Sequence, residues 1–129
     1  DLYGPNDAQL VLNGTPRFYI MKLPARGMCF DSLAHHSKCT QCLSSVQQKP
    51  WYIAVAANTV KTPTTDDITV FEVPPGTFIK LERATWHAGP LFPDDERDFY
   101  NLELSDTNVT DGTWSDPADN QNILYNVVL

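Results

Sequence analysis

The chain has 129 residues, 42% of them hydrophobic, which is enough for one domain with one core and too short for two. The formal net charge is −7 and the nine Lys and Arg residues are scattered, so the sequence lacks the basic face that nucleic-acid binding needs. It has no apolar run of about 18 residues and no N-terminal secretion signal. We therefore expect no membrane contact and an intracellular protein, most simply a cytoplasmic one, with an organelle as the alternative.

Short strands separated by turns are the recurring pattern after an N-terminal arm at residues 1–15. Alternating or short apolar runs predict strands at residues 17–23, 27–33, 34–45, 51–57, 68–73, 78–81, 98–104 and 123–129. The run 51–57 is apolar at nearly every position, so we expect both its faces to be covered. Residues 105–122 are polar and loop-rich. This spacing, with no helical periodicity, predicts a single all-β domain over residues 1–129, a sandwich or barrel.

A barrel leaves a mouth where inward-facing polar side chains meet a ligand, and residues 82–90 supply the densest candidate segment. It reads ERATWHAGP and places the imidazole of His87 beside Trp86 and a Gly-Pro turn. A histidine at a strand end also occurs as a structural residue whose hydrogen bonds are satisfied locally. The segment alone leaves both interpretations open.

His36 and Gln41 form the second candidate pair. Their odd spacing places them on opposite faces of a regular strand, so a bulge or turn must separate them if both reach one pocket. His35 points the other way, and we expect it to be structural or exposed to solvent.

The cysteines Cys29, Cys39 and Cys42 predict reduced, partly buried thiols. Cys39 and Cys42 have C-x-x-C spacing, but no βαβ unit surrounds them as in a redox motif. No second pair with matching spacing completes a zinc site.

A longer set of segments carries a family resemblance. Residues 75–92 read P-x-x-FIKL-x-R-x-TWHAGPLF, and the strand 98–104 reads DFYNLEL. The pair His36 and Gln41 and the strand 51–56 precede them in the same order. Together these segments, over about residues 17–110, resemble the ureidoglycolate lyase (ureidoglycolate hydrolase) family, most nearly its plant and algal branch. The resemblance implies a cupin-like double-stranded β-helix, a jelly-roll barrel, that forms a homodimer.

Two regions depart from the family pattern. The family's first strand has no counterpart, so the N-terminal part is predicted to be truncated or divergent. The tail from Asp111 onward also differs from the family's ending. Gly76 and His87 fall on the spacing of the second cupin motif, in which Glu82 and Ala84 replace a proline and a glycine.

The activity that the resemblance implies is cleavage of ureidoglycolate to glyoxylate and urea, a step of allantoin and purine catabolism. The reaction needs one base and one acid, and His36 and His87 are predicted to supply them in an order left open. Gln41 is predicted to orient the ureido or hydroxyl group. The remaining predicted substrate-binding residues are Lys80 with its rivals Arg83 and Arg17 for the carboxylate, Trp86, and Glu103, which fixes a histidine tautomer.

The metal expectation attached to cupin barrels is weak in this sequence. The first cupin motif, with its His-x-His pair, is missing, so His36, Gln41 and His87 are the only ligands left for a possible divalent ion. Two alternatives to a lyase stay open. One is a binding module without turnover, and the other is a metal-dependent enzyme on another small polar substrate.

Overall fold

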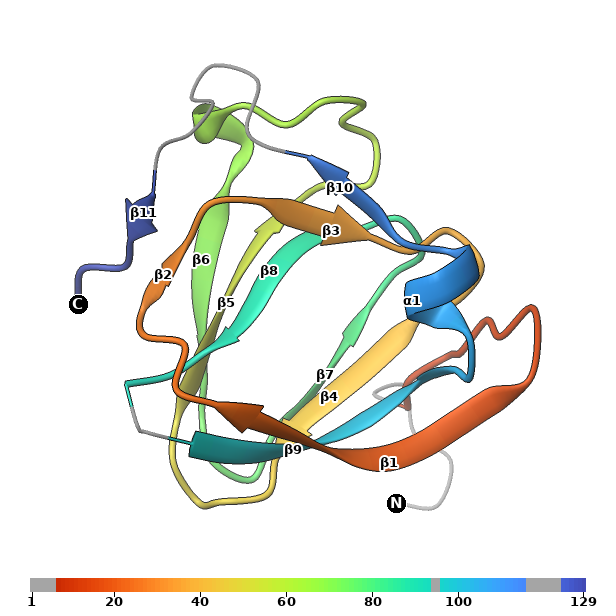
Figure 1. Cartoon of the computed structure of the whole chain (residues 1–129), viewed down its shortest axis with the longest axis horizontal. Coiled ribbons are helices and arrows are strands. Elements are labelled where there is room, and N and C mark those ends of the chain that lie inside the picture. Colours follow the sequence, from red (N-terminus) through yellow and green to blue (C-terminus); the bar gives the residue numbers. More distant parts are fainter. Residues whose placement is uncertain (1–6, 94–95, 116–123) are drawn as a thin grey trace.

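The computed structural model describes residues 7–93, 96–115 and 124–129, and strands dominate them (Figure 1). The first sheet has the order β1 (Pro16–Pro24), β9 (Glu96–Leu104), β4 (Gln41–Ser45) and β7 (Phe78–Leu81). The second sheet has the order β10 (Thr113–Ser115), β3 (Leu33–His35), β8 (Trp86–Leu91), β5 (Trp51–Ala56) and β6 (Thr69–Val73). The other elements are the paired strands β2 (Cys29–Phe30) and β11 (Tyr125–Asn126), the 3-10 turn η1 (Thr65–Asp67) and the helix α1 (Thr107–Thr110).

The two sheets face each other, and the strands within each are antiparallel (Figure 1). This architecture confirms the predicted all-β, cupin-type sandwich or barrel. Among the helices in the described residues, none is long and apolar enough to cross a membrane.

Several predicted boundaries are corrected by the structure. The predicted strand 27–33 is two short strands, β2 and β3, separated by a bend. The predicted strand 34–45 is interrupted between His36 and Gln41, which supplies the turn that their odd spacing requires. Residues 86–91, which no predicted strand covers, form β8, and β9 begins at Glu96, two residues before the predicted strand 98–104. The region 105–122 contains α1 and β10, and its residues 116–122 lie outside the described residues.

The second sheet is covered on both faces, as the apolar run 51–57 predicts. Between the sheets a core forms from Leu43, Trp51, Ile53, Val73, Leu81, Phe92 and Phe99. On the other face of the second sheet a separate cluster forms from Phe30, Leu33, Tyr52, Ala54, Ala56, Trp86, Ala88 and Leu91. Met28, Tyr125 and Val127 pack against that second cluster, so the chain's own C-terminal strand covers this face.

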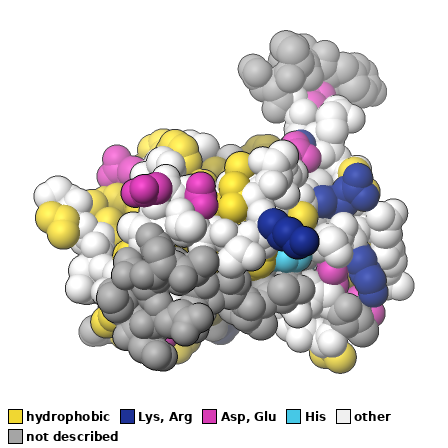
Figure 2. All heavy atoms as spheres, turned by 90° about the horizontal axis from the view of Figure 1, so that it is seen from above, with side chains coloured by type: hydrophobic (Ala, Val, Ile, Leu, Met, Phe, Trp, Pro, Cys, Tyr) yellow, Lys and Arg dark blue, Asp and Glu magenta, His cyan; other side chains and the backbone are white. Residues whose placement is uncertain are grey.

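Charged side chains of both signs are mixed with uncharged ones on the face shown in Figure 2. The Lys and Arg side chains visible there lie apart from one another, among acidic and neutral groups. This face therefore presents no continuous basic surface, in agreement with the net charge of −7. The cysteines Cys29, Cys39 and Cys42 are free thiols.

Candidate active site

Strand register gathers a row of polar side chains on the inner face of the first sheet. Arg17 of β1 lies opposite Glu103 of β9, and Tyr19 lies opposite Asn101. Because Cys42 of β4 pairs with Leu102, Gln41 takes the next position, beside Glu103. Residues opposite one another in a sheet share a face, so these side chains meet on the side that faces the second sheet.

Glu103 is the centre of this polar row and only 2% of its surface is exposed. Its Oε1 accepts hydrogen bonds from Arg17 Nη2 at 2.8 Å and from the Tyr19 hydroxyl at 3.0 Å. Its Oε2 accepts from Gln41 Nε2 at 3.4 Å. Asn101 joins the row, since its Oδ1 accepts from Gln41 Nε2 at 3.1 Å and its Nδ2 donates to the Tyr19 hydroxyl at 3.0 Å. Burial and the nearby Glu103 carboxylate raise the pKa of Tyr19, which keeps its hydroxyl a donor.

This network fixes the orientation of the Gln41 amide. A carboxylate only accepts hydrogen bonds, so the Gln41 nitrogen must face Glu103. The Gln41 oxygen, Oε1, is then left buried, with no hydrogen-bond partner among the described residues. Gln41 is one of the residues that line the cavity between the sheets, and an unpartnered buried acceptor beside a cavity is a candidate contact for a ligand.

His36 and His87 come together because β3 and β8 are neighbours. Ala34 of β3 lies opposite His87, and His36 follows two positions later. Their ring centroids are 5.3 Å apart. His36 Nδ1 donates to the Asp111 carbonyl at 3.0 Å, and His87 Nδ1 donates to the Thr85 carbonyl at 3.0 Å. Since a carbonyl only accepts, Nδ1 of each ring carries a proton, and Nε2 is the nitrogen of each ring that is left for proton transfer.

The Asp111 side chain holds the turn that carries His36. Its carboxylate accepts from the backbone nitrogens of Ser37 at 3.0 Å and Lys38 at 2.7 Å, and from the Ser37 hydroxyl at 3.0 Å. Burial alone raises the pKa of Asp111, but the hydrogen bonds from Lys38 and Ser37 outweigh it and lower the pKa. The turn formed by residues 82–85 is held beside His36, because the Ala84 backbone N–H donates a hydrogen bond to the His36 carbonyl at 2.7 Å.

His87 is neutral at physiological pH. Burial lowers its pKa from 6.5 to about 4, against the opposing effect of its hydrogen bond to Thr85. The nearby His36 and His35 act in the same direction as burial. His87 Nε2 is therefore available as a proton acceptor at pH 7.

These side chains line a cavity of about 570 Å³ between the two sheets. Its polar lining includes Tyr19, His36, Gln41, His87, Asn101 and Glu103. Arg26 and Asp31 are exposed and belong to the same lining. The structure thus brings the predicted residues His36, Gln41, His87 and Glu103 to one place.

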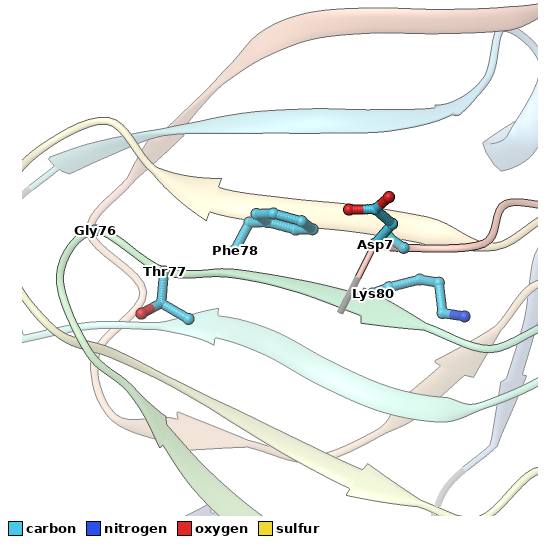
Figure 3. Close-up of a pocket in the computed structure, with 6 residues that line it drawn as sticks. Asp7, Gly76, Thr77, Phe78 and Lys80 are labelled. Carbon is cyan, nitrogen blue, oxygen red and sulfur yellow. The ribbon is translucent and has the colours of Figure 1, made fainter. Parts of the chain in front are cut away.

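Three predicted substrate-binding residues lie elsewhere, and for Lys80 and Trp86 the alternation of side chains along strands is the reason. Lys80 points to the outer face of the first sheet (Figure 3), where Nζ donates to the Gln9 carbonyl and lies 2.6 Å from a Glu82 oxygen. Arg83 is exposed in the turn before β8. Trp86 packs in the cluster on the far face of the second sheet, where Nε1 donates to the Val60 carbonyl at 2.8 Å.

The role predicted for Glu103 is corrected as well. Among the described residues, no hydrogen bond joins Glu103 to either histidine. The carbonyls of Asp111 and Thr85 instead determine that Nδ1 of each ring carries a proton. Sequence analysis missed Tyr19, Asn101 and Asp111. Tyr19 and Asn101 are inward positions of strands that were predicted correctly, so alternation carried a usable signal for them, whereas no local pattern marks Asp111.

The described residues offer an incomplete donor set for a metal ion. Nε2 of His36, Nε2 of His87 and Oε1 of Gln41 are neutral donors, while the Glu103 carboxylate is taken by other side chains. No group of three or more His, Cys, Asp or Glu side chains in the described part of the chain could hold an ion. A divalent ion binds weakly to so few ligands with no charge among them, so the set does not fit a resident metal.

The fold and the cavity define a cupin-type barrel with a polar site built around two histidines, a class suited to chemistry on small polar molecules. The sequence model of ureidoglycolate lyase matches residues 10–121. The chain therefore belongs to the ureidoglycolate lyase family, which confirms the resemblance and makes the protein a lyase. The comparison with curated proteins gives no match.

The low pKa of His87 predicts a loss of stability in acid. The folded state holds His87 neutral, so its contribution is present above pH 6.5, its ordinary pKa, and is lost as the pH falls through about 4. The difference of pKa corresponds to about 3 kcal/mol. Between pH 7.5 and pH 4, the free energy of unfolding, measured with urea, should fall by about 3 kcal/mol more in the wild type than in His87→Asn. Equal pH dependence in both proteins would refute a neutral, buried His87.

Proposed function

We propose that the cavity cleaves ureidoglycolate to glyoxylate and urea, with His87 as base and His36 as acid. The observation that supports this is that His36 and His87, whose ring centroids are 5.3 Å apart, line one polar cavity together with Gln41, whose Oε1 has no partner among the described residues. The family supports a role on ureidoglycolate in general terms. The geometry adds the residues that would act on it.

The reaction needs one proton removed and one delivered. His87 Nε2 takes the proton of the substrate hydroxyl, and the electron pair of that O–H bond forms the carbonyl of glyoxylate. The carbon–nitrogen bond breaks, and its electron pair goes to the ureido nitrogen, which takes a proton from Nε2 of protonated His36. Urea leaves. His87 suits the base role because its lowered pKa keeps Nε2 unprotonated at pH 7.

Substrate recognition follows from the polarity of the lining. Gln41 Oε1 accepts a hydrogen bond from a ureido N–H, and the Glu103 and Asn101 contacts hold it in that orientation. Arg17 is engaged by Glu103, so it is less suited to bind the carboxylate. Arg26 is the one Lys or Arg among the described residues that line the cavity, and we assign the carboxylate to its guanidinium.

The products distinguish this reaction from other reactions of the same substrate. We expect the purified chain to release glyoxylate and urea in equal amounts from ureidoglycolate, at the same rate with and without a chelator. Release of ammonia in place of urea would show hydrolysis of the ureido group and contradict the proposed bond cleavage. Binding with no turnover would favour the binding module, and loss of activity with chelator would favour a metal-dependent enzyme.

Arg26→Gln tests the assignment of the substrate carboxylate. Removing one charge-assisted hydrogen bond at an exposed position should raise KM about tenfold and change kcat less than about threefold. Arg83→Gln is the matched control, since Arg83 is exposed and lies outside the cavity. Steady-state kinetics measure KM and kcat of both variants. An unchanged KM in Arg26→Gln, or a larger rise in Arg83→Gln, would contradict it.

A further inference from the structure

The two histidines of the cavity have different charged neighbours. Both rings are buried, with 7% of His36 and 9% of His87 exposed, and both donate from Nδ1 to a backbone carbonyl. Burial and the carbonyl contacts are therefore features that the two rings share. The difference is that the Asp111 carboxylate is held beside His36, whereas the charges that act on His87 are those of His36 and His35.

Strand pairing brings Asp111 to this position. β10 runs antiparallel to β3 with Thr113 opposite His35, so Asp111 comes opposite the residue that follows His36. α1 ends at the same point, because the Asp111 backbone N–H donates to the Thr107 carbonyl at 3.1 Å. Figure 1 shows α1 and β10 beside the end of β3. Asp111 is only 8% exposed, so water and salt screen its charge little.

The hydrogen bonds of the Asp111 carboxylate do not cancel its charge. Its donors are the backbone N–H groups of Ser37 and Lys38 and the Ser37 hydroxyl, all of which are neutral. Burial raises the pKa of Asp111, but these hydrogen bonds lower it, and so does a protonated His36. Because the attraction between two opposite charges is mutual, the carboxylate favours the protonated form of His36.

Other ionisable groups surround His36, but two of the carboxylates already have cationic partners. Glu103 of β9 pairs with Arg17, and Glu82 of the turn before β8 pairs with Lys80. The remaining ionisable groups beside His36 or in the same cavity lining are His35, His87, Tyr19, Cys29, Cys39, Lys38, Arg26 and Asp31. Among these, Arg26 and Asp31 are exposed and opposite in sign. Within the described residues, Asp111 is therefore the buried carboxylate beside His36 that no Lys or Arg side chain neutralises.

We infer that Asp111 is a positioning residue that holds the proton shared by the His36–His87 pair on His36. The ring centroids lie 5.3 Å apart, so a proton on one ring disfavours a proton on the other, and the pair carries one proton over an intermediate range of pH. With that proton on His36, Nε2 of His87 stays free to accept. The consequence for catalysis rests on the proposed function, in which His36 is the acid and His87 the base.

The pH dependence of kcat/KM tests this consequence. Activity requires the pair with one proton, so it is lost at high pH when that proton leaves. Asp111→Asn removes the charge and keeps the backbone carbonyl that His36 Nδ1 contacts. The pair should then lose its proton at a pH about one unit lower, and the basic limb of the profile should move down with it.

Ser37→Ala is the matched control. It removes one hydrogen bond to the Asp111 carboxylate and keeps the carboxylate charge. Any loosening of the turn should lower kcat/KM at every pH, and the basic limb should stay in place. Asp111→Ser also removes the charge, and it replaces Asp111→Asn if circular dichroism melts show that Asp111→Asn fails to fold.

¹⁵N NMR of the imidazole nitrogens tests the same inference without substrate. As the pH is lowered, the first proton that the wild-type pair takes up should appear on His36 Nε2, and in Asp111→Asn it should appear at a pH about one unit lower. A titration and a basic limb that stay in place in Asp111→Asn, or that move equally in Ser37→Ala, would overturn the inference. A shifted titration in a chain that does not turn over ureidoglycolate would refute the proposed function and support the inference.

Discussion

Replacing His87 by asparagine should lower kcat/KM for ureidoglycolate by about 100-fold to 10,000-fold, the range for loss of a general base. The asparagine amide can still donate to the Thr85 carbonyl, as His87 Nδ1 does. What it cannot supply is the electron pair of Nε2. The substitution therefore removes the proposed base and keeps the hydrogen bond that positions it.

His35→Asn is the control for this experiment. His35 is the third histidine of the chain, next to His36 in sequence, but its ring packs against Trp86 at 4.1 Å and does not line the cavity. We expect His35→Asn to keep activity within about twofold, since it touches no group assigned to the reaction. Activity in His87→Asn close to that of His35→Asn would remove His87 from the base role.

Replacing Glu103 by glutamine should affect both stability and substrate binding. Glu103 accepts hydrogen bonds from Arg17, Tyr19 and Gln41, and hydrogen bonds to a charged group contribute about 1.5–3 kcal/mol. We expect the free energy of unfolding to fall by about that amount. The new amide also presents N–H groups to the Gln41 nitrogen, so the Gln41 amide should turn over and direct its N–H groups into the cavity. The acceptor for the ureido group is then lost, and KM should rise about tenfold.

Glu72→Gln is the matched control for Glu103→Gln. Glu72 also accepts a hydrogen bond from a tyrosine hydroxyl, that of Tyr52 at 3.0 Å, but it is exposed on the second sheet. Its replacement should change stability by less than about 1 kcal/mol and leave KM unchanged. Chemical unfolding and steady-state kinetics measure both quantities. A Glu103→Gln variant with wild-type KM would contradict the proposed role of Gln41, whatever its stability.

The strands could be predicted because alternation is a local signal. The patterns at residues 17–23 and 98–104 mark β1 and β9, and the apolar run at 51–57 marks a strand covered on both faces. What the pattern does not contain is the pairing. Arg17 of β1 and Glu103 of β9 are 86 positions apart, and only the register of the two strands decides that they meet.

The site could be predicted only in part for the same reason. Local patterns made His36, Gln41 and His87 candidates, but mainly the resemblance joined them into one site, because one strand pattern does not say which strands become neighbours. Lys80 was expected in the cavity, but it alternates with Leu81, which packs in the core between the sheets. Asp111 lies beyond the segments that carry the resemblance, and it reaches His36 through tertiary contacts that no sequence pattern shows.

The most direct test of the central claim is ¹⁵N NMR of the imidazole nitrogens while oxalurate is added. Oxalurate carries a keto group where ureidoglycolate carries its hydroxyl, so it occupies the site and lacks the proton that starts the reaction. We expect the Nε2 signals of His36 and His87 to shift with saturation, the Nδ1 signals of both to remain those of protonated nitrogens, and His35 to stay unchanged. Saturable binding that leaves the Nε2 signals of His36 and His87 unmoved would contradict the claim that these two histidines act on the substrate.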